Sequence, residues 1–265
     1  MANVSPASRQ PAVFYGHGSP MNALESNRHT QAWRASGEAG APARAVLAIS
    51  AHWYVDELAV TAMAQPRTIH DFGGFPPALF AVRYPAPGDP ALAARVRELL
   101  APMPVRLDHD WGLDHGIWSV LAHVYPQADV PVVQLSLDAR QGPAFHHELG
   151  RRLAVLRDEG VRIVGSGNAV HHLERLSWRP DARPHEWALA FEAGVRDCVL
   201  RGDDAPLIDY ERFGEAARLS VPTPDHYLPM LAVLGARLPG DRARVLTEGI
   251  ELGSIGMLSF ALEPT

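Results

Sequence analysis

The sequence predicts a single-domain α/β sandwich, in which helices flank a mostly parallel central sheet. Two observations support this fold class. The chain has 265 residues, of which 47% are hydrophobic, and α/β folds of roughly 250 residues commonly form one domain. Apolar runs of strand length alternate with helical patterns, as expected when helices cover both faces of a parallel sheet. With no internal repeat or long linker, residues 1–265 are expected to form one domain.

The expected elements follow in order along the chain. We interpret five apolar runs as buried strands, namely residues 12–16, 45–50, 58–63, 131–137 and 161–165. Apolar residues recurring with the helical period predict helices over 89–101, 115–124, 142–158 and 185–201. The first of these helices begins with Asp89 and Pro90, a typical cap and first-turn pair. Near the C-terminus, 243–248 and 257–262 are predicted to be antiparallel edge strands.

Composition excludes several function classes. A net charge of −6 without a basic stripe argues against nucleic acid as a partner. All 24 basic residues are arginine, which excludes Schiff-base chemistry, pyridoxal phosphate attachment and a P-loop lysine. The one cysteine, Cys198, lies in a predicted helix and is expected to be a small buried residue.

No membrane or secretory segment is expected. The longest apolar runs are well short of the roughly 20 residues that a spanning helix needs. Residues 1–12 lack the basic start and apolar core of a signal peptide. We therefore expect a soluble, cytoplasmic protein without a membrane partner.

Histidines gather where the predicted strands end. His17 and His52 end the first two strands, His171 follows the 161–165 strand after a short turn, and His226 lies in a proline-bounded loop before a helix. Ligands of open α/β sheets bind beyond the carboxyl ends of the strands, and neutral imidazole is the commonest protein ligand for zinc and also suits iron. These four residues are candidate metal ligands. Singly, each could equally be a capping or hydrogen-bonded polar side chain.

His115 begins the predicted helix over 115–124, where it could either hydrogen-bond at the helix terminus or act as an acid or base. His70 could reach a pocket, although Asp71 and the following GGFPP loop favour a structural role. Surface or packing positions are expected for the remaining histidines, which are His29, His109, His123, His146, His147, His172 and His185.

Seven motifs follow one another from about residue 12 to residue 260: GHGSPMNALE, SAHW, IHDFGGFPPALF with YPAPG, LDHGIWSVL, VPVVQLSLD, GSGNAVHHL and TPDHYLPML. In this order they resemble the class III extradiol ring-cleavage dioxygenases of the protocatechuate 4,5-dioxygenase beta-subunit-like type. More narrowly, the chain resembles the 4,5-DOPA dioxygenase extradiol branch. Residues 1–265 would then form one extradiol dioxygenase-like catalytic domain.

The resemblance implies that His17, His52 and His226 hold a divalent metal, with His171 as a further ligand or a base. It also implies that His115 lies over the metal and assists proton transfer. Position 226 departs from the wider class III group, which has glutamate there. An all-imidazole site suits Zn²⁺ as well as non-haem Fe²⁺. Position 172 also departs, since related sequences tend to carry asparagine.

The implied reaction opens the ring of a small, DOPA-like catechol with O₂. Side chains that could wall an aromatic ring, or fill the core instead, are Trp53, Phe72, Phe75 and Trp118. An α/β-hydrolase is excluded, because that fold needs a G-x-S-x-G nucleophile motif and no serine has glycine at both −2 and +2. Two alternatives stay open: a zinc-dependent hydrolase, and a non-catalytic, metal-stabilised binding protein on the same fold. Neither the catechol nor the oligomeric state is specified by the sequence.

Overall fold

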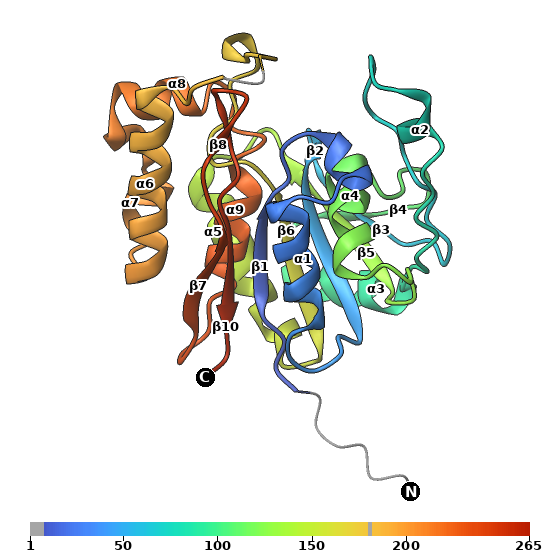
Figure 1. The fold of residues 1–265 in the computed structure, drawn as a ribbon. Coiled ribbons are helices and arrows are strands. Elements are labelled where there is room, and N and C mark those ends of the chain that lie inside the picture. Colours follow the sequence, from blue (N-terminus) through green and yellow to red (C-terminus); the bar gives the residue numbers. More distant parts are fainter. Residues whose placement is uncertain (1–7, 180–181) are drawn as a thin grey trace, which may run out of the picture.

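An eight-stranded sheet forms the centre of the molecule, with helices packed on both of its faces (Figure 1). The computed structural model describes residues 8–179 and 182–265. The strand order is β4-β3-β5-β2-β6-β1-β10-β7. Four neighbouring pairs are parallel and three, at the two sides of the sheet, are antiparallel. The α/β fold with a mostly parallel central sheet, predicted from the sequence, is confirmed.

The strands are β1 (Ala12–Gly16), β2 (Ala45–Val55), β3 (Leu58–Thr61), β4 (Val105–Asp108), β5 (Val132–Asp138), β6 (Val161–Gly167), β7 (Arg242–Thr247) and β10 (Ser259–Glu263), with a small hairpin of β8 (Ile250–Glu251) and β9 (Ile255–Gly256). The α-helices are α1 (Arg28–Glu38), α2 (Pro77–Phe80), α3 (Pro90–Leu100), α4 (His115–Val124), α5 (Pro143–Leu153), α6 (Glu186–Arg201), α7 (Ala205–Ile208), α8 (Glu215–Ser220) and α9 (Leu228–Gly235).

Most predicted elements are confirmed, including the antiparallel strands β7 and β10 near the C-terminus. Asp89 caps α3 by accepting a hydrogen bond from the Leu92 amide at 2.9 Å, and Cys198 is buried in α6. The expected helix over 142–158 instead divides into α5 and a short 3₁₀ helix. Helix α1 was not predicted, because the face that it buries includes the polar residues His29, Thr30 and Ser36.

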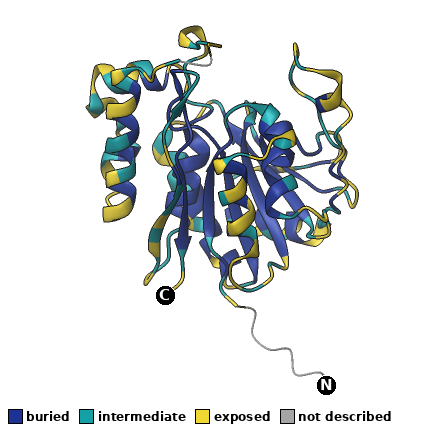
Figure 2. Ribbon diagram, viewed as in Figure 1, coloured by how far each residue is buried: buried dark blue, intermediate teal, exposed yellow. Residues whose placement is uncertain are grey.

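The sheet separates two hydrophobic clusters. Because successive side chains of a strand point to opposite faces, Leu47 and Ile49 of β2 belong to the cluster under α3, α5 and α9. Val46 and Ala48 of the same strand belong to the cluster under α1 and α4. Figure 2 shows the central strands in the colour of buried residues, with exposed residues on the outer sides of the helices. This double burial explains why the strands are apolar throughout.

Helices α5 and α9 cross at close range on one face. A Cβ atom at Gly150 would lie only 1.8 Å from the carbonyl oxygen of Ala232, so a side chain at this position would force the helices apart. This close contact holds α9 against β6 and fixes the segment that precedes α9. Over the described residues, no helix is long and apolar enough to cross a membrane.

Candidate metal centre and active site

Five histidines line one cavity of about 260 Å³ at the carboxyl ends of the central strands. They come from five segments of the chain: His17 follows β1, His52 lies in β2, His115 begins α4, His171 follows β6 and His226 precedes α9. The structure therefore brings together every histidine that the sequence predicted as a ligand or catalytic group. We call these five histidines the histidine cage. Its first half consists of His17, His52 and His115, and its second half consists of His171 and His226.

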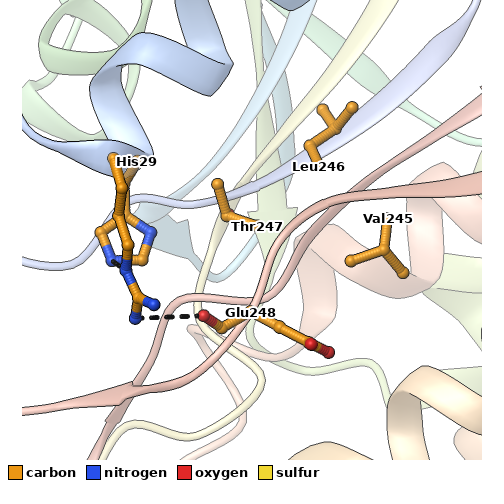
Figure 3. Close-up of a pocket in the computed structure, with 6 residues that line it drawn as sticks. His29, Val245, Leu246, Thr247 and Glu248 are labelled. Carbon is orange, nitrogen blue, oxygen red and sulfur yellow. Dashed lines mark hydrogen bonds between the residues drawn. The ribbon is translucent and has the colours of Figure 1, made fainter.

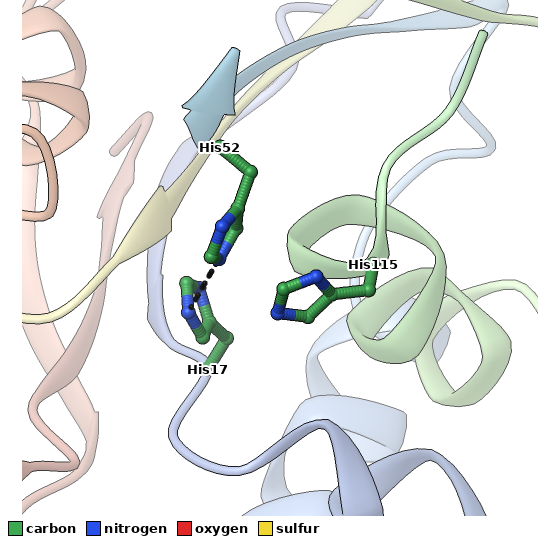
Figure 4. Close-up of side chains that lie close together, drawn as sticks. All are labelled: His17, His52 and His115. Atoms are coloured by element: carbon green, nitrogen blue, oxygen red, sulfur yellow. Dashed lines mark hydrogen bonds between the residues drawn. The ribbon is translucent and has the colours of Figure 1, made fainter. Parts of the chain in front are cut away.

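An irregularity in β2 places His52. Ile49 and Tyr54 of β2 pair with residues of β5 that are only two positions apart, so four residues of β2 are accommodated by one of β5. Bulges of this kind re-aim side chains and are common beside active sites. The His52 side chain consequently points into the cavity, where it faces His17 (Figure 4).

A buried polar group supports this irregular segment from behind. The Ser50 hydroxyl accepts a hydrogen bond from the His52 amide at 3.2 Å and donates one to the Asp114 carboxylate at 2.7 Å. Asp114 also caps α4 by accepting from the Ile117 amide at 3.3 Å. Burial raises the pKa of Asp114 to about 6, and the nearby charge of Asp71 adds to this effect. One carboxylate thus links the His52 segment to the helix that carries His115.

The ring nitrogens of the first half converge. His17, His52 and His115 each offer a nitrogen, and these atoms all lie within 4.8 Å of one another. The Nε2 atoms of His17 and His52 are 3.3 Å apart (Figure 4). Such a cluster of imidazole nitrogens matches the donor set that zinc and iron prefer.

Hydrogen bonding fixes the tautomer of His17. Its Nδ1 lies 2.9 Å from the Ser166 hydroxyl, which itself donates to the Gly116 carbonyl at 2.5 Å. Because the Ser166 proton is used in that bond, Nδ1 of His17 must carry the hydrogen and Nε2 presents a lone pair to the cavity. The serine therefore prepares His17 as a ligand.

Asp71 orients His115 in the same way. Its carboxylate accepts hydrogen bonds from both the amide and Nδ1 of His115, each at 2.9 Å, and lies 3.6 Å from Nδ1 of His52. Burial alone would raise the pKa of Asp71, but the bonds from His115 outweigh it and the pKa lies below its ordinary value. The carboxylate is thus an acceptor that leaves Nε2 of His115 unprotonated and directs it away from Asp71.

The second half is built from loops. The rings of His171 and His226 stack in parallel, with centroids 3.5 Å apart, and the His226 ring lies 5.0 Å from that of His52. Nδ1 of His226 makes a short hydrogen bond to Asp225. This bond outweighs the effect of burial and lowers the pKa of Asp225 to about 2.

Close backbone packing seats His226 at the end of β6. The His226 carbonyl accepts a hydrogen bond from the Asn168 amide at 2.9 Å. A Cβ atom at Gly167 would lie 2.2 Å from the same carbonyl oxygen, so only glycine allows this approach. The motif GSGNAV is therefore required for His226 as well as for His171, which it precedes.

The hairpin of β8 and β9 supports the second half from one side. His171 forms a bridge with Ile255, and the Ser254 hydroxyl donates to the His172 carbonyl at 2.8 Å. Behind the hairpin, the buried carboxylate of Glu192 accepts hydrogen bonds from the Gly249 amide at 2.6 Å and from the Leu258 amide at 3.3 Å.

A second cavity, of about 370 Å³, lies between the start of α1 and the end of β7 (Figure 3). Within it, the guanidinium of Arg28 donates to the Glu248 carbonyl at 3.3 Å. The adjacent His29 side chain is fully buried and lies 2.8 Å from the carboxylate of Glu251 in β8. His29 is thus a packing residue, as expected, and it ties the hairpin to α1.

Burial favours the neutral form of three of the imidazoles, those of His17, His52 and His171. It lowers the pKa of His17 and of His52 well below the ordinary value, and the neighbouring histidines lower both further. Burial, followed by the effect of His226, lowers the pKa of His171 to about 2. With Nδ1 of His17 protonated, its Nε2 lone pair faces Nε2 of His52 at 3.3 Å, so both nitrogens are directed at the same point of the cavity. The residues present therefore fit a divalent metal.

Two of the four aromatic side chains proposed as cavity walls do line the cavity, namely Phe72 and Phe75. Trp53 does not; it is buried and stacks on Trp111 with ring centroids 5.4 Å apart. Trp118 is also core, and its indole donates to the Ile69 carbonyl at 2.7 Å. Trp53 and Trp118 are therefore core residues, which is the alternative that the sequence left open.

Sequence reasoning missed several residues of the site. Asp71 and Asp225 each stand beside a histidine, as His-Asp and Asp-His pairs, which is a usable signal. Ser166 carries no local signal that relates it to His17. His70 does not line the cavity, since its Nε2 bonds the Val82 carbonyl at 3.0 Å. Additional apolar lining residues are Leu173, Leu176, Trp178, Leu252 and Ile255.

Such a set of imidazoles at the carboxyl ends of an α/β sheet indicates a metal-binding site of a kind found in enzymes. Residues 11–262 match the family described as the catalytic LigB subunit of aromatic ring-opening dioxygenase, and the chain belongs to this family. It is an extradiol ring-cleaving dioxygenase. The family resemblance inferred from the motifs is confirmed.

Individual relatives agree with this assignment. The chain is 50% identical to "4,5-DOPA dioxygenase extradiol" of Escherichia coli (strain K12), over 96% of this chain and 94% of that protein. It is 35% identical to the protein of the same name from Beta vulgaris, over 95% and 96% of the two chains. A crystal structure of an uncharacterized protein from Escherichia coli K12 superposes with a TM-score of 0.85 at 45% identity, over 96% and 100% of the two chains.

The matches to a catalytic subunit and to proteins named as dioxygenases favour this activity over the hydrolase and binding-protein alternatives. Together, the family and the histidine cluster indicate a divalent metal site. They also imply an aromatic substrate and O₂.

Proposed function

We propose that this enzyme cleaves a DOPA-like catechol beside its two hydroxyl groups, with O₂, at a metal held by His17, His52 and His226. His171 serves as a further ligand or as a base. The observation that carries this proposal is the close approach of the Nε2 atoms of His17 and His52, 3.3 Å apart, in a cavity lined by five histidines. The catechol itself is proposed from the names of the relatives.

When bound, the divalent metal would supply a Lewis acid that lowers the pKa of a coordinated catechol hydroxyl and offers a position for O₂. The protein residues hold the ligand rings in place. Ser166 and Asp225 each engage an Nδ1 atom, so that the Nε2 atoms of His17 and His226 remain unprotonated. Second-sphere bonds of this kind fix both the tautomer and the direction of each ring.

His115 is the proposed proton acceptor. Asp71 holds its Nδ1 hydrogen, so Nε2 is free to take the phenolic proton and later to return it. The ring also packs edge-on against Phe72, with centroids 5.3 Å apart, which keeps bulk water from one side of the imidazole. A carboxylate that accepts from the distal nitrogen stabilises the imidazolium formed in the process.

A second ligand set is favoured by one observation. The three nitrogens that lie within 4.8 Å of one another belong to His17, His52 and His115. In that arrangement His115 would be a ligand, and His171 would be left as the base. The metal content of variants at positions 115 and 226 separates the two assignments.

For the metal, we propose iron(II) in the active enzyme and zinc as a competing occupant, because an all-imidazole site suits both. Purified protein should be analysed for its metals and then loaded anaerobically with iron(II) or with zinc. On admission of air, only the iron-loaded protein should consume O₂ and yield a yellow semialdehyde from a catechol. No O₂ uptake with any of a panel of catechols would refute the proposed activity.

The proposed catalytic domain comprises residues 1–265, and the proposed location is the cytoplasm. The buried free thiol of Cys198 suits a reducing compartment. Fractionation of cells that produce a tagged full-length chain tests the location.

A further inference from the structure

A single hydroxyl group lines the cavity of the histidine cage. It belongs to Ser19, and no other described residue that lines the cavity carries a hydroxyl. Ser19 is half-buried and follows His17 by two residues, in the turn GHGSP. Because two residues of chain span at most about 7 Å, Ser19 belongs to the end of the cavity where the nitrogens of the first half converge.

The turn holds Ser19 beside His17. Gly18, between them, has a φ of 61°, a left-handed conformation that favours glycine and reverses the chain. The side-chain amide of Asn22 donates to the His17 carbonyl at 3.0 Å. The backbone amide of the same residue donates to the Ser19 carbonyl, also at 3.0 Å. One asparagine thus fixes the position of the hydroxyl relative to the imidazole of His17.

The Ser19 hydroxyl has a hydrogen to donate. Its oxygen accepts from the Met21 amide at 3.2 Å and so caps the short 3₁₀ helix Pro20–Leu24. Capping uses a lone pair of the oxygen, whereas a serine hydroxyl can accept and donate at once. Within residues 8–179 and 182–265, no acceptor forms a hydrogen bond with its hydrogen. A molecule bound in the cavity can supply that acceptor.

Other polar groups near the cavity lie at its mouth. Trp178 lines the cavity and is 70% exposed, so its indole N–H is a donor at the solvent end. The charged residues of the same segment are Glu174, Arg175 and Arg179, which are exposed and do not line the cavity. This segment suits the polar substituent of a DOPA-like catechol, while Ser19 stands at the end where the two ring hydroxyls are directed.

We propose that Ser19 is a further substrate-binding residue, whose hydroxyl donates a hydrogen bond to a catechol oxygen that has lost its proton. This inference rests on the proposed function for the orientation of the ring and for the removal of the proton by His115. A hydrogen bond to a charged oxygen is stronger than one to a neutral oxygen, and it favours the ionised form. Ser19 therefore both tightens binding and lowers the pKa of the bound catechol.

The test measures binding and ionisation separately from turnover. Zinc-loaded full-length protein is titrated without oxygen with 4-nitrocatechol, whose visible absorption reports its own ionisation, at a series of pH values. A hydrogen bond to a charged group contributes about 10- to 100-fold in affinity. We expect Ser19→Ala to bind the probe at least about tenfold more weakly and to raise the pKa of the bound probe by about one unit. Catechol itself, followed by calorimetry, should lose affinity by a similar factor.

Two further variants serve as controls. Ser19→Thr keeps the hydroxyl and the helix cap and should restore both affinity and ionisation. Ser26→Ala should behave as wild type, because Ser26 is exposed just beyond the same 3₁₀ helix and does not line the cavity. The zinc content of every protein is determined before titration.

The inference is overturned if Ser19→Ala binds both ligands as wild type does, if Ser19→Thr restores neither property, or if wild type binds no catechol. Loss of zinc from Ser19→Ala would also overturn it, because the residue would then act by placing His17. If the variants behave as expected but iron-loaded wild type consumes no O₂, the proposed function fails and the role of Ser19 in binding stands. If O₂ is consumed while Ser19→Ala binds normally, only the inference fails.

Discussion

The two halves of the histidine cage are held by different kinds of contact. In the first half, His17 is oriented by Ser166 of β6 and His115 by Asp71 of the loop before α2, each distant in sequence from its histidine. In the second half, His226 is oriented by its neighbour Asp225, and His171 leans on the hairpin of β8 and β9. The first half therefore depends on side-chain contacts between distant segments, whereas the second depends on an adjacent carboxylate, on a small hairpin and on the backbone contact of His226 with the end of β6.

The strongest test of this comparison is metal retention. We expect His17→Ala and His226→Ala each to lose the metal, because each removes one imidazole whose Nε2 is prepared for coordination. Elemental analysis after anaerobic iron(II) loading and desalting measures this loss. His109→Ala, at an exposed position outside the cavity, is the control. Full metal content in both site variants would show that neither half holds it as proposed.

The variant His115→Ala tests whether His115 is a metal ligand or a general base. We expect this variant to keep its metal and to lose about 10²- to 10⁴-fold in kcat, the usual contribution of a general acid or base. The measurement is O₂ uptake by protein whose metal content has been determined. Loss of the metal instead would favour the alternative ligand set of His17, His52 and His115.

The two halves of the cage can also be compared by removing the carboxylate that orients a histidine in each of them. We expect Asp71→Asn to cost about 10- to 100-fold in kcat, because Asn presents an amide group where His115 needs two acceptor oxygens. Asp225→Asn should instead lower metal affinity by a similar factor, since Asp225 contacts His226. A metal-binding isotherm and the pH profile of kcat distinguish the two effects. Equal effects of both variants on kcat and on metal affinity would contradict the proposed difference between a catalytic role of Asp71 and a metal-holding role of Asp225.

The smallest predicted effect is on the free energy of unfolding and comes from Glu192, which hydrogen-bonds the backbone next to the hairpin of β8 and β9. Burial raises the pKa of this carboxyl to about 7. Between its unfolded pKa near 4.3 and that value, the native state keeps a proton that the unfolded state releases, so stability from this group is lost as pH rises. From about pH 5 to about pH 8, wild type should lose on the order of 2 kcal/mol relative to Glu192→Gln.

Urea unfolding of both proteins without metal measures this difference. His17, His52 and His171 titrate with the opposite sign, since their lowered pKa values make stability fall as pH drops below about 6.5, but they are present in both proteins and cancel. A difference that stays constant with pH would show that Glu192 is ionised throughout.

Much of the molecule was predictable from the sequence for an identifiable physical reason. Buried parallel strands are apolar over their full length, so β1, β5 and β6 were recognisable. Histidines placed where such strands end pointed to the cage, because the topology brings these ends together. The order of seven motifs then identified the family.

What the sequence did not predict depends on contacts between distant segments. Asp71 lies 44 positions from His115, and Ser166 lies 149 positions from His17, so no local pattern relates them. Trp53 and Trp118 show the same limit, since an aromatic side chain at either position fits a cavity wall and a core equally well until the fold decides. The sequence also does not show which aromatic side chains are exposed, and no local pattern distinguishes Trp178 from the other tryptophans.

The extra residues of β2 around His52 also matter for transplanting this site. An engineer who copied the five histidines onto a regular parallel sheet would place residue 52 in the pleat, with its ring directed at a covering helix. The graft would have to include the irregular segment from Ile49 to Tyr54 together with Asp114, whose buried carboxylate holds Ser50 in place. The smallest portable unit of this site is therefore a piece of backbone with its support, and the five side chains alone would not suffice.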